Sequence, residues 1–311
     1  MKKVILHIGY PKTGTTTLQE SVFKNLHQAK LINYLGRSRN KINRFDGVDT
    51  AIQLRYFSLY NTRPIEISIE ENEVNIISDE NFLMLDLINK IQYHGENNWR
   101  EVLNKVFSCL RDFDVEIIVT LRKQSDLIWS LYLQKFKYIY ANNKKLEFKN
   151  FIEDTCFNMK SELDIYNFEI LDGHLRQYTS SINYLFFEDL ISDKAIFATQ
   201  LSSIVGCKNH LLEPLLEKKY RLNTSYKKAE KVYEVSVKES IIPFVKFDYR
   251  PKGIMQRIKN KMFFDRIIKV SQPSKVLLEK LMSHYEVSND KFFGKYEDLY
   301  LKAISYNYLR K

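Results

Sequence analysis

The chain has 311 residues, of which 44% are hydrophobic, so it can bury the core of one large domain. Its net charge of +10 favours anionic partners, but no helix-turn-helix, zinc or RNA-binding motif accompanies that charge, so we do not expect nucleic acid. Cys109, Cys156 and Cys207 lack metal-binding spacing and indicate a reducing compartment. The short apolar run before Gly9 is no signal peptide or membrane span, so we expect a soluble, cytoplasmic protein.

The first predicted element is a strand that enters a glycine loop and then a helix, over Val4–Gln19 (V-I-L-H-I-G-Y-P-K-T-G-T-T-T-L-Q). Gly9 and Gly14 permit a tight turn, and the unpaired N–H groups at the start of the following helix attract anions. We therefore expect a phosphate-binding loop made by Pro11, Lys12, Thr13, Gly14, Thr15, Thr16 and Thr17.

This loop differs from the usual nucleotide-triphosphate loop, G-x-x-x-x-G-K-[ST], because Thr15 replaces the lysine and Lys12 stands inside the loop. The arrangement Y-P-K-T-G-T-T-T-L resembles the 5′-phosphosulfate loop of sulfotransferases that use 3′-phosphoadenosine 5′-phosphosulfate (PAPS). The resemblance implies an enzyme that transfers a sulfuryl group, with PAPS as co-substrate and no requirement for a metal.

A second strand is expected near residues 74–78, in V-N-I-I-S-D-E-N-F-L, and it ends in acids. Sulfuryl transfer to a hydroxyl needs a base near the acceptor. Ser78-Asp79-Glu80 resembles the segment that follows this strand in bacterial and carbohydrate sulfotransferases, so Glu80 is the candidate base. Asp79 is its rival, His94 is a minor alternative, and Glu80 could also serve only as a first-turn helix acid.

A third strand is expected near residues 115–121, with Arg122 at its carboxyl end and Ser130 eight residues later on a helix. Sulfotransferases bind the 3′-phosphate of PAPS with an arginine and a serine at this spacing. A guanidinium offers phosphate a planar set of donors, which suits that role. The alternative is structural, with Arg122 capping the strand and Ser130 packing against a neighbouring helix.

Later segments add to the resemblance. A fourth strand near residues 183–187 is followed by Glu188 and Asp189, which we interpret as first-turn helix acids. Arg221 belongs to an R-x-N-x-S segment seen in bacterial sulfotransferases and could close over the nucleotide. Of the late phosphate loop of cytosolic sulfotransferases, this chain has only R-P-K-G at 250–253. The position of that loop here is therefore open, and the partial match favours the bacterial or carbohydrate-type branch.

The order of these elements predicts an α/β fold with a P-loop-like central parallel sheet flanked by helices. A helix is expected from Thr15 to about His27, with Leu18, Val22 and Leu26 buried, and residues 31–35 could add a short strand. We expect a single domain over 1–311, with the sheet core in about 1–210 and a mainly helical extension in about 211–311.

The predicted function is transfer of a sulfuryl group from PAPS to an acceptor hydroxyl, with Glu80 as base and Lys12 stabilising the leaving phosphate. By analogy the acceptor is a carbohydrate or glycolipid. Two alternatives stay open. One is a divergent nucleotide kinase or NTPase with magnesium at Thr15 or Thr16 and Asp79 as a second acid. The other is a non-catalytic protein whose basic stretch, residues 218–261, binds an anionic glycan, lipid or membrane surface.

Overall fold

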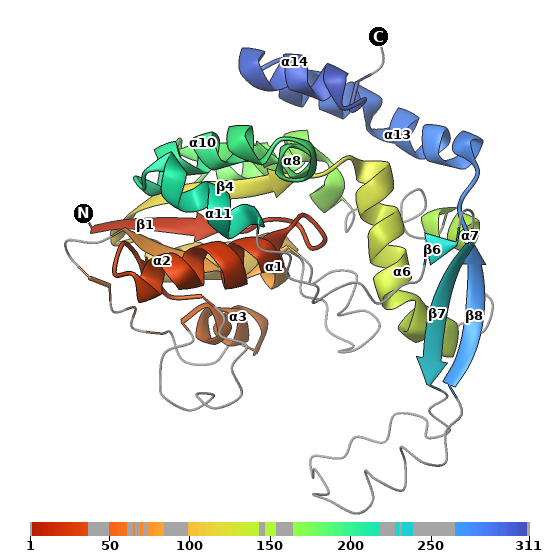
Figure 1. Ribbon diagram of the computed structural model, residues 1–311, viewed down its shortest axis with the longest axis horizontal. Coiled ribbons are helices and arrows are strands. Elements are labelled where there is room, and N and C mark those ends of the chain that lie inside the picture. Colours follow the sequence, from red (N-terminus) through yellow and green to blue (C-terminus); the bar gives the residue numbers. More distant parts are fainter. Residues whose placement is uncertain are drawn as a thin grey trace, which may run out of the picture.

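A computed structural model describes residues 2–36, 50–60, 65, 67, 69–70, 74–83, 99–142, 147–153, 164–217, 228–229, 232–238 and 265–309. Its centre is a five-stranded parallel sheet in the order β2-β3-β1-β4-β5 (Figure 1). The strands are β1 (Lys2–His7), β2 (Asn33–Tyr34), β3 (Asn75–Ser78), β4 (Phe113–Leu121) and β5 (Ile182–Phe186). The predicted α/β class and each predicted strand are confirmed.

The first strand lies in the middle of the sheet. Val4 pairs with Asn75 of β3 on one side and with Val115 of β4 on the other. Alternate side chains of β1 enter two separate cores, Val4 and Leu6 on one face and Ile5 on the other. Because both faces are covered, the strands are apolar runs without polar alternation, as in other buried parallel sheets.

Helices cover both faces of this sheet (Figure 1). On the face of Ile5 the core includes α1 (Thr15–Thr17), the π-helical η1 (Leu18–Phe23), α2 (Lys24–Gln28), α10 (Lys194–Val205) and α11 (Asn209–Glu217). The first three run on as one helix and bury Leu18, Val22 and Leu26, as predicted. The core on the other face includes α3 (Thr50–Tyr60), α5 (Trp99–Leu110), α6 (Gln124–Asn142), α8 (Phe168–Leu175) and α13 (Lys275–Phe293). It continues along α6 to α7 (Phe148–Ile152), which lies beside the antiparallel strands of the C-terminal part (Figure 1).

The C-terminal part contains α13 and α14 (Glu297–Ser305), in line with the expected helices. It also contains an antiparallel sheet of β6 (Lys228–Ala229), β7 (Val232–Lys238) and β8 (Asp265–Ser271), which the sequence analysis did not predict. The alternating pattern V-Y-E-V-S-V-K of β7 is typical of a strand with one buried face. That face meets α6, where the rings of Tyr233 and Trp129 lie 5.5 Å apart.

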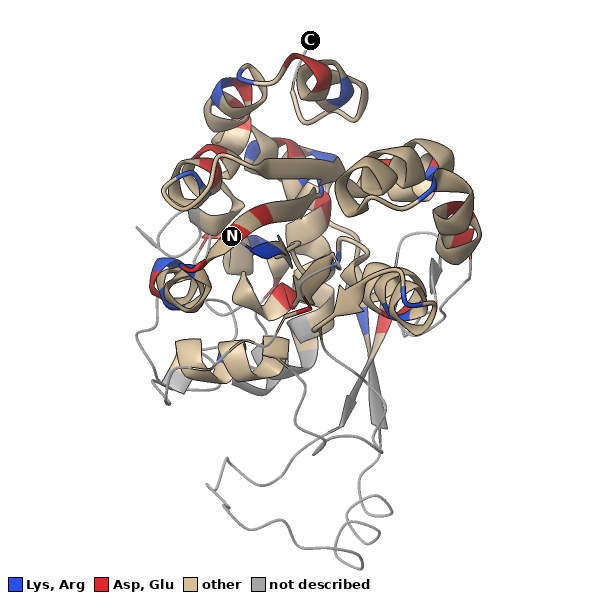
Figure 2. Ribbon diagram, turned by 90° about the vertical axis from the view of Figure 1, so that its left-hand side faces the viewer, with Lys and Arg blue, Asp and Glu red and all other residues tan. Residues whose placement is uncertain are grey.

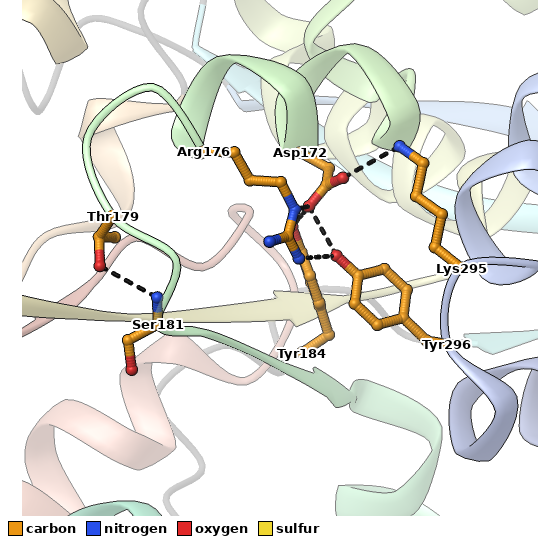
Figure 3. Close-up of polar contacts among 7 residues, drawn as sticks. All are labelled: Asp172, Arg176, Thr179, Ser181, Tyr184, Lys295 and Tyr296. Atoms are coloured by element: carbon orange, nitrogen blue, oxygen red, sulfur yellow. Dashed lines mark hydrogen bonds and ion pairs between the residues drawn. The ribbon is translucent and has the colours of Figure 1, made fainter.

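A buried carboxylate attaches the C-terminal helices to the sheet core (Figure 3). Asp172 of α8 accepts hydrogen bonds from Tyr184 of β5 at 2.9 Å and from Tyr296 at 2.7 Å. It also pairs with Arg176 at 2.9 Å and Lys295 at 3.2 Å. Tyr296 and Lys295 lie between α13 and α14, so this fully buried group fixes the junction of those helices.

Positions of basic and acidic residues are interspersed along the outer helices (Figure 2). Most of the basic stretch, residues 218–261, lies outside the described residues. Within the described ranges, no helix combines the length and the apolar character that crossing a membrane requires.

Candidate active site

The loop after β1 has the backbone of an anion-binding turn. Lys12 and Gly14 both adopt left-handed conformations, with φ of 70° and 78°. Gly14 caps the following helix, where Leu18 N–H donates to Gly14 O at 3.1 Å and no side chain caps the end. The hydroxyl of buried Thr13 donates to Tyr10 O and so holds the turn from within. The structure therefore confirms a tight turn that leads into a helix, and such a helix start is a common place for anions to bind. The anion site itself stays a prediction.

The structure brings Arg122 against this loop. Arg122 Nη1 donates to Lys12 O at 2.8 Å, although the two residues are 110 positions apart, and its guanidinium lies over the Phe187 ring at 4.7 Å. Burial, followed by the nearby charge of Arg122, lowers the pKa of Lys12, and burial lowers the pKa of Arg122. Two half-buried cations at one place repel each other, and a bound anion would relieve this.

Ser130 lies on α6, half-buried, and Arg122 is at the carboxyl end of β4 that leads into that helix. The remaining predicted loop residues, Pro11, Thr15, Thr16 and Thr17, line the same turn. Arg221 and the R-P-K-G segment at 250–253 lie outside the described residues.

Glu80 is joined to the helix that follows the phosphate loop. It begins η3 (Glu80–Phe82) directly after β3, and its Oε2 accepts a hydrogen bond from Gln19 Nε2 at 2.8 Å. The same Gln19 amide donates to Ser78 Oγ at 3.1 Å, and Ser78 Oγ bonds His7 Nδ1 at 2.7 Å. Glu80 is half-buried, and the Gln19 amide holds its carboxylate in place.

Asp79, the rival base, serves a structural role. It is fully buried, it accepts the Asn81 backbone N–H at 2.9 Å to cap η3, and it pairs with Arg55 at 3.0 Å. Burial raises the pKa of Asp79 to about 6, although Arg55 opposes that shift. His94, the third alternative, lies outside the described residues.

Two residues at this edge of the sheet were not anticipated as part of the site. Glu188 stands in the first turn of α9 (Phe187–Ser192), as predicted, but its Oε1 also accepts the Lys123 backbone N–H at 3.2 Å. Its Oε2 accepts the Tyr308 hydroxyl at 2.9 Å. Tyr308 is 120 positions away, in the segment after α14, and no local sequence pattern could have paired the two.

The metal-binding side chains, the buried histidine of β1 and the cysteines are also relevant to the expected chemistry. Among the residues that the structure describes, no three metal-binding side chains cluster together. His7 is fully buried within β1, as expected, and burial lowers its pKa to about 3, so the ring is neutral. Cys109 and Cys207 are free thiols.

The family model of the sulfotransferase domain matches residues 2–283. The chain belongs to the sulfotransferase family. This membership confirms the predicted enzyme class, a sulfotransferase with PAPS as co-substrate, and it favours that class over the kinase alternative.

Solved structures resemble this sulfotransferase at low identity. A sulfotransferase from Alicyclobacillus acidocaldarius is 11% identical, covers 94% of this chain and 95% of its own, and gives a TM-score of 0.47. Retinol dehydratase in complex with retinol and PAP is 17% identical, with 70% of this chain and 64% of that chain covered and a TM-score of 0.36. Its complex with androsterone and inactive cofactor PAP is 16% identical with the same coverage and TM-score. No curated protein matches the sequence.

Proposed function

We propose that this sulfotransferase moves the sulfuryl group of PAPS to a hydroxyl of a carbohydrate or glycolipid, with Lys12, Glu80 and Arg122 in the central roles. The observation that carries the proposal is the placement of Arg122 against the backbone of Lys12, which sets two half-buried cations beside one phosphate loop. PAPS carries anionic groups at both its 5′ and 3′ positions, so it offers an anion to each cation.

On the nucleotide side, the loop from Pro11 to Thr17 would hold the 5′-phosphosulfate. The helix start at Gly14 supplies backbone donors, and the Lys12 ammonium supplies a positive charge. Arg122 and Ser130 would bind the 3′-phosphate, because a guanidinium matches phosphate oxygens in two places at once. Arg221 belongs to this proposal as a residue that closes over the nucleotide.

The chemistry is an in-line displacement at sulfur. A bond forms between the acceptor oxygen and sulfur, and the bond from sulfur to the bridging 5′-phosphate oxygen breaks. Glu80 takes the acceptor proton, and its bond from Gln19 keeps the carboxylate oriented. Lys12 stabilises the negative charge that develops on the leaving phosphate oxygen. These residues need no metal for either step.

The acceptor class rests on the resemblance of the Ser78-Asp79-Glu80 segment to bacterial and carbohydrate-type sulfotransferases. The net charge of +10 suits an anionic glycan or a peripheral contact with an anionic membrane surface. A cytoplasmic location is part of the same proposal, and the free thiols of Cys109 and Cys207 fit a reducing compartment.

Calorimetric titration with adenosine 3′,5′-bisphosphate (PAP), and separately with ATP plus magnesium, tests the nucleotide site. We expect PAP to bind without metal and Arg122→Ala to weaken that binding at least tenfold, because a charged hydrogen bond to phosphate is lost. Arg111→Ala is the control, since Arg111 is exposed and pairs with the equally exposed Asp112. A preference for ATP with magnesium that Arg122→Ala leaves unchanged would refute the proposal.

A transfer assay tests the acceptor. Labelled PAPS would be offered with oligosaccharides, glycolipids and simple phenols, and product would be compared for the wild type and Glu80→Gln. We expect label on sugar hydroxyls and a loss of about 100-fold or more in rate for Glu80→Gln, in line with removal of a general base. Exclusive labelling of phenols would overturn the acceptor class, and full activity of Glu80→Gln would overturn the role of Glu80.

A further inference from the structure

Glu188 lies between the nucleotide site and the C-terminal segment. Its carboxylate is half-buried, and each oxygen has a separate donor, the Lys123 N–H at 3.2 Å and the Tyr308 hydroxyl at 2.9 Å. Burial lowers the pKa of Arg122, and the nearby charges of Asp126 and Glu188 raise it, so Glu188 is close enough to act on that guanidinium. The carboxylate therefore stands near the cation to which we assign the 3′-phosphate.

A carboxylate in this position could compete with the nucleotide. Carboxylates and phosphates use the same two-pronged face of a guanidinium, so an Arg122–Glu188 ion pair would block phosphate. Among the residues that the structure describes, Arg122 forms no such ion pair. Its Nη1 instead donates to Lys12 O, and the guanidinium lies over the Phe187 ring.

The Tyr308 ring is held rigidly enough to direct its hydroxyl. It is 2% exposed, and its ring packs against Phe186 of β5 and Phe293 of α13, with each centroid separation 5.4 Å. The segment that carries it is fastened nearby, because buried Asp189 binds Lys302 at 2.6 Å and Tyr306 at 2.5 Å. Burial raises the pKa of Tyr308, so the hydroxyl keeps its proton and donates a hydrogen bond to Glu188.

We propose that Tyr308 is a positioning residue of the nucleotide site, which binds Glu188 and thereby keeps that carboxylate away from Arg122. The 3′-phosphate then meets a guanidinium that Glu188 has not neutralised. This inference rests on the proposed function, since it needs Arg122 to bind the 3′-phosphate. It gives the C-terminal segment after α14 a part in selecting nucleotides that carry a 3′-phosphate over those that lack it.

The test compares two ligands that differ only in the 3′-phosphate, PAP and adenosine 5′-monophosphate. Their dissociation constants would be measured by calorimetry for the wild type, Tyr308→Phe and Tyr306→Phe. Tyr306→Phe is the matched control, because it removes a tyrosine-to-acid hydrogen bond from the same segment, at Asp189 rather than at Glu188. We expect Tyr308→Phe to weaken PAP about fivefold to tenfold and to leave the monophosphate unchanged, since one hydrogen bond to a charged group is lost.

A double variant tests the competition itself. In Glu188→Gln the side chain at position 188 has no charge to pair with Arg122. Adding Tyr308→Phe to this variant should therefore cost no further PAP affinity. Thermal melts of each variant would show that it is folded. The inference is overturned if Tyr308→Phe and Tyr306→Phe alter the ratio of the two affinities equally, or if the Tyr308→Phe loss persists in Glu188→Gln. If the wild type does not prefer PAP and Arg122→Ala changes nothing, the proposed function fails as well, which separates the two results.

Discussion

The left-handed backbone at Gly14 gives a prediction with an internal control. Gly14 has φ of 78°, and a Cβ added there would lie 2.3 Å from Leu190 Cδ2. Gly206, the exposed cap of α10, has nearly the same φ of 72°, and a Cβ there would meet nothing within 4 Å. Alanine at either position bears the same backbone cost, roughly 1 to 2 kcal/mol, because its Cβ crowds the next carbonyl. Only Gly14→Ala must also displace Leu190.

The two variants should therefore differ in both stability and binding. We expect Gly206→Ala to lower the free energy of unfolding by roughly 1 to 2 kcal/mol and Gly14→Ala by roughly 2 to 4 kcal/mol, since displacing a packed leucine adds at least 1 kcal/mol. PAP affinity should fall only in Gly14→Ala, where the helix start is moved. Urea unfolding measures the first effect and calorimetry the second. Equal destabilisation by the two variants, with normal PAP binding in both, would refute this account of the loop.

Three further predictions concern other groups. Lys12→Ala should lower the transfer rate about 100-fold or more while PAP still binds, which a steady-state assay with labelled PAPS would measure; an unchanged rate would remove Lys12 from the chemistry. Asp172→Asn should lower the free energy of unfolding by about 2 kcal/mol, because several donors lose a charged acceptor, and urea unfolding would measure this. An unchanged urea midpoint would contradict the role of Asp172 in attaching the C-terminal helices. The free energy of unfolding of the wild type should fall by about 1.6 kcal/mol between pH 6.5 and 5 relative to that of His7→Gln, since the unfolded His7 takes up a proton near its ordinary pKa of 6.5 while the folded ring, with a pKa of about 3, does not. Parallel stability curves for the two proteins would contradict the neutral ring.

Local patterns were sufficient to predict the sheet and the turn that follows β1. Apolar runs such as Val115–Leu121 are short and buried on both faces, so their type and order could be predicted from sequence alone. Lys12, Glu80 and Arg122 come shortly after the carboxyl ends of three strands, and parallel strands bring these ends to one edge of the sheet. The assignments of individual residues to the nucleotide and the acceptor stay predictions.

Long-range pairing could not be predicted in the same way. Glu188 is a plain first-turn helix acid by sequence, yet Tyr308 reaches it from a segment 120 positions away. Gln19 looks like one polar residue among several on a helix, and only the fold sets it between Ser78 and Glu80. The antiparallel sheet was missed for a different reason, because β7 alternates over few residues within a stretch whose proline breaks and charges obscure the pattern.

The position of β1 in the sheet fixes when the phosphate loop can form during synthesis. Its two neighbours, β3 and β4, come later in the chain, and His7 pairs with Ile118 as well as with Ser78. The loop after β1 therefore has no completed scaffold until the chain beyond β4 has left the ribosome. Such distant parallel pairing also slows folding, since the intervening chain must be closed into a loop first. The loop after β1 is thus made before the strands that support it, and it becomes able to bind a nucleotide only after those strands are in place.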